Sequence, residues 1–143
     1  MEEFDLERFK EAQAYGYEGY ETALREIRAG RKVSHWIWYI FPQLKGLGHS
    51  YYCDYYGISG LSEAEAYLKD ETLGVRLREI TEALLGHKGE NAVDILGSID
   101  ARKVRSCMTL FDILAPADVF AEVLDAFYEG KRDRRTLDMV GKA

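Results

Sequence analysis

The sequence predicts an all-α fold, a compact single-domain multihelical bundle of about seven or eight short helices over residues 1–143. Apolar residues recur every three or four positions, as at Leu73, Leu77, Ile80 and Leu84, which is the spacing of a buried helix face. A long alternation of apolar and polar residues, the pattern of a strand, does not occur. The length is typical of one domain, and no repeat or linker divides the chain.

Residues that favour helix ends place the individual helices. Side chains of serine, threonine, asparagine and aspartate accept backbone N–H groups at helix starts, and glycine commonly ends helices. Helices are therefore expected to be capped by Asp5, Ser34, Ser62, Thr72, Asp100 and Asp133, and to end at Gly30, Gly86, Gly97 and Gly130, with a helical turn or two over residues 91–96. Pro42 ends the short helix that follows Ser34. Residues 51–58 fit a short strand, a turn or an irregular stretch equally well.

The composition indicates a soluble globular protein with an acidic surface. Asp and Glu number 25 against 19 Lys and Arg, which gives a formal net charge of −6. Since nucleic-acid binding depends on neutralising phosphates, general nucleic-acid binding is not expected. The apolar run at residues 36–41 is too short to cross a membrane, and the acidic start lacks the pattern of a signal peptide. Two cysteines without Cys-x-x-Cys spacing suit a reducing compartment, so a cytoplasmic location is expected.

Aromatic residues are concentrated in one stretch of the chain. Residues 35–56 contain eight of its eighteen Phe, Trp and Tyr residues, together with two of its three histidines. Aromatic faces stack on planar ligands and on cations, so this stretch is a candidate binding site. A short helix here is expected to bury one side and to present His35, Trp38 or Tyr39 on the other. The commoner outcome for aromatics at helical spacing is burial in the core, which applies first to Trp36 and Phe41.

A glycine-containing loop follows the aromatic helix. Gly46 and Gly48 can expose backbone N–H groups, and with a lysine and Ser50 nearby such groups suit a phosphate or carboxylate. The spacing matches neither a Walker loop nor a dinucleotide fingerprint, and a plain turn is the alternative. His35, His49 and Cys53 have no familiar zinc-site spacing, so no metal is expected. No cofactor is expected either.

A second polar segment lies at residues 103–109. Lys103, Ser106 and Thr109 are three residues apart, so on a helix they share a face and could line a polar site. The alternative is a solvated lysine with hydroxyls that bond to their own helix. Cys107 with His35 could form a nucleophile and base pair, but an apolar-face cysteine is more often buried and inert.

Both segments resemble a known bacterial family, the domain of unknown function 1810, whose members are often mislabelled calpastatin-like. The matching residues are Phe9, Ala12, Gln13, Gly30, Arg31, Lys32, Ser34, His35, Trp36, Trp38, Phe41, Pro42, Gln43, Gly46, Leu47, Gly48, Ser50, Glu63, Ala64, Tyr67, Leu68, Leu73, Gly74, Arg76, Leu77, Gly97, Asp100, Lys103, Ser106, Met108, Thr109, Leu110, Phe111, Thr136 and Leu137. The resemblance covers nearly the whole chain. It implies a compact multihelical fold and brings no activity. Ile37 stands where the family usually has methionine, and Cys107 where it usually has a second serine.

The favoured function is a pocket for a small anionic, nucleotide-like ligand, formed where the two segments meet. Aromatics would stack on a planar group while lysines and the glycine loop hold the anion; the expected ligand-binding residues are Lys32, Trp36, Trp38, Gln43, Gly46, Gly48, Ser50, Lys103, Ser106 and Thr109. If a reaction occurs, His35 is the expected catalytic acid or base, because its pKa lies nearest neutrality. Whether the protein is an enzyme stays open. The alternatives are a protein-interaction module with an exposed aromatic patch, and a motif that only fixes helix packing.

Overall fold

The structure is a computed structural model that describes residues 4–14 and 16–141, and in that part of the chain it has helices and loops but no strands. Within these residues it has ten α-helices and one 3-10 helix. They are α1 (Glu7–Ala14), η1 (Gly16–Glu18), α2 (Tyr20–Arg28), α3 (Ile37–Ile40), α4 (Tyr51–Tyr55), α5 (Leu61–Lys69), α6 (Leu73–Leu85), α7 (Ala92–Leu96), α8 (Ser98–Leu114), α9 (Val119–Tyr128) and α10 (Arg134–Gly141). The all-α prediction is confirmed. The helices outnumber the seven or eight expected, and the one that the sequence did not indicate is the five-residue α4, in the stretch that also fitted a strand or a turn.

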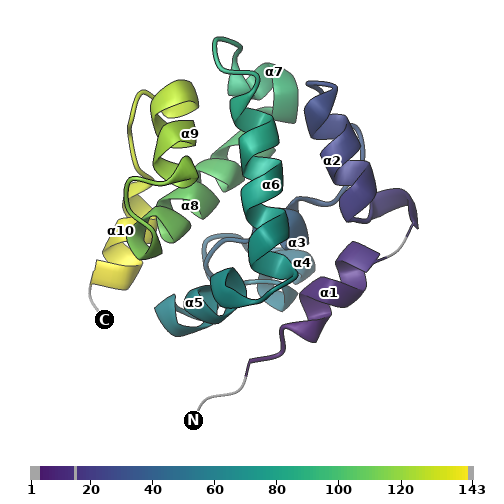
Figure 1. Cartoon of the computed structure of the whole chain (residues 1–143). Helices are drawn as coiled ribbons and strands as arrows, with labels where there is room; N and C mark the ends of the chain where they lie inside the picture. The colour runs from purple at the N-terminus through teal and green to yellow at the C-terminus, as the bar shows by residue number, and fades with distance from the viewer. Residues whose placement is uncertain (1–3, 15, 142–143) are drawn as a thin grey trace.

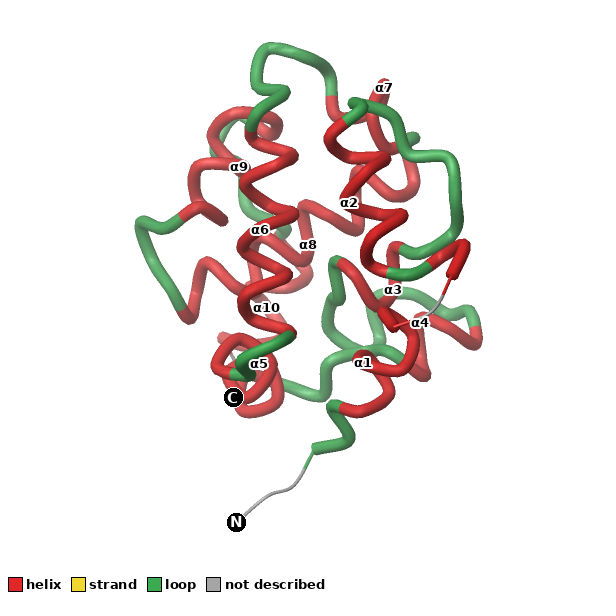
Figure 2. Tube along the Cα trace, turned by 45° about the vertical axis from the view of Figure 1, so that its right-hand side comes forward, coloured by secondary structure: helices red, strands yellow, loops and turns green. Residues whose placement is uncertain are grey.

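Two long helices organise the molecule. Helix α6 lies at the centre and contacts α2, α5 and α9, while α8 contacts α5, α7, α9 and α10 (Figure 1). The short helices α3 and α4 lie on the side of the molecule where α1 is found, as the tube trace shows (Figure 2). The fold therefore has a helical body, and the aromatic segment of α3 and α4 is packed against one side of it.

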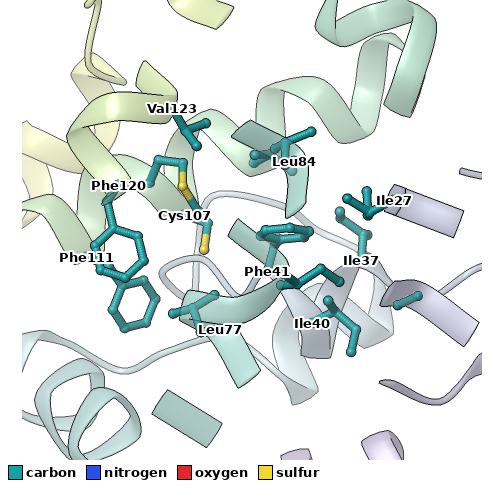
Figure 3. Packing of buried hydrophobic residues seen from close by; sticks show 14 of the residues in the cluster. Ile27, Ile37, Ile40, Phe41, Leu77, Leu84, Cys107, Phe111, Phe120 and Val123 are labelled. Carbon is teal, nitrogen blue, oxygen red and sulfur yellow. The ribbon is translucent and has the colours of Figure 1, made fainter. Parts of the chain in front are cut away.

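One continuous hydrophobic core joins these helices. Figure 3 shows Phe41 and Ile37 of the aromatic segment facing Leu84, while Cys107 and Phe111 of α8 lie towards Phe120. All of these side chains are at most 1% exposed. Burying a large apolar side chain stabilises a fold by about 1.5–3 kcal/mol, so the core ties the aromatic segment firmly to the body.

Of the predicted helix caps, Asp133 is confirmed, because it accepts the Thr136 N–H at the start of α10. Thr72 precedes α6 but its side chain accepts no N–H, and the carboxylate of Asp70 accepts the Leu73 N–H instead. The corrections concern Ser34, Ser62 and Asp100, which cap no helix: α3 begins at Ile37, whereas Ser62 and Asp100 lie inside the first turns of α5 and α8. Ser34 and Asp100 instead bind charged side chains of neighbouring segments.

The ambiguous residues 51–58 form a helix followed by a backbone pairing. Helix α4 is capped by Ser50, whose Oγ accepts the Cys53 N–H at 3.1 Å. The chain then pairs with itself, because Lys45 N donates to Ile58 O at 2.8 Å and Ile58 N donates to Gln43 O at 2.9 Å. This pairing closes the loop that carries α4 and holds Gln43 beside it.

The described residues contain no helix with both the length and the apolar character needed to cross a membrane.

Candidate functional site

A groove with a volume of about 330 Å³ lies where α8, α10 and the loop after α3 meet. This basic groove is lined by Gln43, Leu47, Gly48, Ile99, Arg102, Lys103, Ser106, Asp133 and Arg135. Its volume is in the range of about 300–1,000 Å³ that is usual for small-molecule sites. On α8, Ile99, Arg102 and Ser106 are three or four residues apart, so one face of the helix forms the wall.

Positive charge dominates the groove among the residues that the structure describes. Arg102, Lys103 and Arg135 line it, against the single carboxylate of Asp133. That carboxylate already accepts the backbone N–H and the hydroxyl of Thr136, at 2.9 and 2.7 Å. Arg102 and Arg135 have no ion-pair partner within residues 4–14 and 16–141, while Lys103 lies 4.0 Å from the Asp100 carboxylate. The groove is thus a cationic site in a chain of net charge −6.

The position of Arg135 depends on how α10 is anchored to α8. Thr109 is fully buried, its hydroxyl donates to Arg105 O at 2.8 Å, and it accepts the Asp133 N–H at 2.9 Å. Asp133 in turn caps α10, so a single joint sets the direction of the helix. The Arg135 guanidinium then lies over the glycine loop, within 3.3 Å of Leu47 O.

A second hollow of about 460 Å³ lies on the other side of Trp38. This aromatic hollow is lined by Ala12, Glu18, His35, Trp38, Tyr39, Tyr52 and Tyr56. His35 is exposed there, and its backbone N–H donates to the Glu18 carboxylate at 3.0 Å. Burial raises the pKa of Tyr39 and of Tyr56, so both hydroxyls stay protonated at neutral pH.

Trp38 separates the groove from the hollow. Its ring lies 4.8 Å from that of Tyr52 and 5.4 Å from the Lys103 ammonium. Beside it is a linking cavity of about 10 Å³, which is lined by residues of both sites and has the volume of about one water molecule. The indole N–H of Trp38 is buried and has no hydrogen-bond partner in the described part of the protein. The two sites share no lining residue, but each shares residues with this cavity, and Trp38 of the hollow lies against Lys103 of the groove.

The structure brings some of the sequence-predicted residues together and keeps others apart. Gln43, Gly48, Lys103 and Ser106 line the basic groove; Trp38 and His35 line the aromatic hollow; Lys32, Trp36, Gly46, Ser50 and Thr109 line neither. Lys32 pairs with Asp100 at 2.8 Å and also donates to Ser34 O, so its charge is satisfied inside the fold. Trp36 is fully buried.

A half-buried carboxylate explains part of the aromatic motif. Glu26 accepts the backbone N–H groups of Val33 and Ser34, the Ser34 hydroxyl at 2.7 Å and the Trp36 indole N–H at 2.9 Å. Burial by itself raises the pKa of Glu26, but the hydrogen bonds from Ser34, Val33 and Trp36 outweigh it and hold the pKa at about 2. Ser34 and Trp36 therefore fix the loop after α2 to the body of the protein.

Sequence reasoning missed the two arginines of the groove, and Ala12 and Glu18 of the hollow. Arg102 belongs to a basic cluster next to Lys103 and carries a weak signal on that account. Arg135 carries none, because only the packing of α10 brings it to α8. Glu18 and Tyr56 of the hollow are likewise placed by tertiary contacts of η1 and α4.

The cysteines and histidines do not form a reactive centre in the described residues. Cys107 is fully buried in the core, and burial raises the pKa of its thiol well above the ordinary value. Because His35 is exposed in the aromatic hollow, the two do not form a nucleophile and base pair. Across residues 4–14 and 16–141, no three His, Cys, Asp or Glu side chains are grouped as a metal-ligand set.

Gly48 is required for packing rather than for exposing its backbone. A Cβ at this position would lie 2.5 Å from Cys53 Sγ. We expect Gly48→Ala to lower the free energy of unfolding by about 1–3 kcal/mol, measured by urea denaturation, because α4 must shift. Removing the sulfur in Gly48→Ala/Cys53→Ala should restore part of the loss. Gly60→Ala is the control, since nothing lies within 4 Å of its Cβ; equal losses at both glycines would contradict the packing argument.

The fold and the two cavities define a helical protein with a cationic groove, and the comparisons with known proteins place it in a family. The chain belongs to the family described as "Protein of unknown function (DUF1810)", whose model matches residues 3–140. The resemblance seen in the sequence is thereby confirmed. Among solved structures, the crystal structure of the conserved hypothetical protein Rv1873 from Mycobacterium tuberculosis is similar at 44% identity, with a TM-score of 0.92 over 96% of this chain and 97% of that one. No curated protein matches the chain.

Proposed function

We propose that the basic groove binds a small anionic ligand. The observation that carries the proposal is the convergence of Arg102, Lys103 and Arg135 on one groove whose single described carboxylate, Asp133, is committed to capping α10. Within the described residues Arg102 and Arg135 form no ion pair, and Lys103 lies only 4.0 Å from the Asp100 carboxylate, whereas Lys32 pairs with Asp100 at 2.8 Å. A bound anion would supply the missing counter-charge.

The chemistry of the groove favours a phosphate or a carboxylate. Guanidinium groups present paired N–H donors that match two oxygens of such an anion, and a lysine adds a point charge. Ser106 and Gln43 add polar groups, while Leu47 and Ile99 offer apolar surface to the rest of the ligand. Such a mixture suits a phosphorylated or carboxylated metabolite better than a bare ion.

Binding, and not turnover, is what we propose. The role of His35 as a catalytic acid or base stays a prediction from the sequence. Its side chain lines the aromatic hollow and not the basic groove. A protein-interaction module is the second candidate, and one observation favours it. Tyr51, Tyr52 and Tyr55 expose 72%, 49% and 42% of their surface on the short helix α4, and exposed tyrosines are enriched in protein interfaces.

Arg135→Ala tests the anion proposal. Phosphorylated metabolites and inorganic phosphate should raise the melting temperature of the wild-type protein. We expect Arg135→Ala and Lys103→Ala each to weaken binding about tenfold or more in calorimetric titrations, because a hydrogen bond to a charged group contributes about 1.5–3 kcal/mol. Increasing salt should weaken binding to the wild type.

Arg134→Ala is the matched control. Arg134 neighbours Arg135 on α10, but it is 84% exposed and pairs with Asp138 outside the groove, so its loss should leave binding unchanged. Titrations in which no anion binds, or in which Arg134→Ala and Arg135→Ala lose affinity equally, would refute the proposal. A stoichiometric protein partner lost with Tyr51→Ala, but unaffected by Arg135→Ala, would support the interaction module instead.

A further inference from the structure

The basic groove and the aromatic hollow are neighbours that share their walls with one cavity. The linking cavity is lined by Gln43 and Lys103, which belong to the groove, and by Trp38, Tyr52 and Tyr56, which belong to the hollow. A ligand seated at Lys103 is thus in reach of Trp38, whose ring centroid is 5.4 Å from the lysine ammonium. The two sites offer different chemistry on the two sides of this cavity.

The hollow is built to receive a flat ring. Four of its seven lining residues are aromatic, from α3 and α4, and the Trp38 and Tyr52 rings are 4.8 Å apart. Tyr52 is 49% exposed, so its ring is accessible to a partner. Every nucleobase can stack on a tryptophan or tyrosine face, because each base has a flat aromatic face.

The groove and the hollow differ in charge. The groove end carries Arg102, Lys103 and Arg135, while the far end of the hollow carries the Glu18 carboxylate. An anionic group is therefore attracted to the basic groove and repelled by the carboxylate in the hollow. The Glu18 carboxylate already accepts the His35 N–H through one oxygen, which fixes it in place.

We infer that the ligand is a nucleoside phosphate whose phosphate lies in the basic groove and whose base lies against Trp38 in the aromatic hollow. The inference rests on the proposed function and adds the class of the ligand and its orientation. Neither the groove alone nor the hollow alone requires the ligand to be a nucleoside phosphate. Three cations in the groove, a tryptophan of the hollow that lies 5.4 Å from one of them, and a carboxylate in the hollow match a molecule that is anionic at one end and flat at the other.

Calorimetric titrations with fragments of one ligand separate the two ends. The probes are AMP, ribose 5-phosphate, adenosine and inorganic phosphate. AMP should bind at least about tenfold more tightly than ribose 5-phosphate, because stacking of one base contributes on that scale. Trp38→Leu should remove that advantage while leaving the affinity for ribose 5-phosphate unchanged, and Trp38→Phe should keep most of it. Arg135→Ala should lower the affinity for AMP and for ribose 5-phosphate by the same factor.

Tyr51→Leu is the matched control, since Tyr51 neighbours Tyr52 on α4 but lines neither site. Equal binding of AMP and ribose 5-phosphate would overturn the nucleotide inference and leave the anion proposal standing. Absence of binding by every phosphate-bearing probe would overturn both. Binding of adenosine as tightly as AMP, or binding that strengthens steadily with the length of a single-stranded oligonucleotide, would also overturn the inference.

Discussion

Replacing Glu63 by alanine is expected to lower the free energy of unfolding by about 3–5 kcal/mol, because it leaves the charge of Arg8 buried without its partner. Arg8 Nη1 lies 2.8 Å from Glu63 Oε2, and the two side chains are 9% and 4% exposed. Urea denaturation monitored by circular dichroism measures the change. Removal of one member of a buried pair costs far more than the pair itself contributes, because the remaining charge has lost its solvation.

The effect of Glu63→Ala should extend to α4 and its tyrosines. The same guanidinium donates to Tyr55 O at 2.9 Å and to Gly57 O at 3.0 Å, so Arg8 joins α1 to the end of α4. Glu65→Ala is the control, since Glu65 lies on the same helix but forms only an exposed pair with Lys69. A loss of less than about 1 kcal/mol for Glu63→Ala, comparable with that of an exposed pair, would show that the buried pair is not structurally important.

Replacing Glu26 by alanine is expected to cost about 3 kcal/mol. Its carboxylate accepts four hydrogen bonds from residues 33–36, each hydrogen bond to a charged group contributes about 1.5–3 kcal/mol, and the donors partly regain water when it is lost. Glu21→Ala, an exposed change on the same helix, should be nearly neutral. Equal losses for the two variants in urea denaturation would contradict this assignment.

The pH dependence of stability provides a second check on Glu26. Its pKa is about 2 in the folded protein against an ordinary value of 4.5, so its contribution is complete above about pH 4.5 and is lost as the pH falls towards 2. Asp70 and Asp118 also have lowered pKa values and act in the same direction. The difference in stability between wild type and Glu26→Gln therefore isolates Glu26, and it should shrink from pH 6 to pH 3. A constant difference would argue against the lowered pKa.

The long helices could be predicted from the sequence because their apolar stripes are strong. Leu73, Leu77, Ile80 and Leu84 are all buried in α6, as their spacing indicates. Helix α4 could not be predicted in the same way, because its run of tyrosines has no polar face. Its position depends on the Ser50 cap and on the backbone pairing of Leu44 with Ile58, and the second of these is a contact between distant residues.

The candidate site was only partly visible in the sequence. Helical spacing correctly brings Lys103 and Ser106 to one face of α8, and both line the groove. Helical spacing does not reveal which basic side chains form ion pairs. Asp100 neutralises Lys32, whereas Arg135 has no described ion-pair partner. Trp36 and Trp38 differ by two positions and so point to different sides, but only the packing determines which of them is buried.

The joint between Thr109 and Asp133 couples the groove to the C-terminal helix. Helix α10 contributes Arg135. It is held on α8 through this joint and, in the residues just before it, through Arg105, which donates to Lys131 O and Arg132 O, and through the ion pair of Arg132 with Asp112. Any free energy that an anion gains at Arg135 therefore also holds α10 against the body of the protein. Occupancy of the groove and docking of α10 would rise and fall together, so detachment of a single helix would be enough to release the ligand.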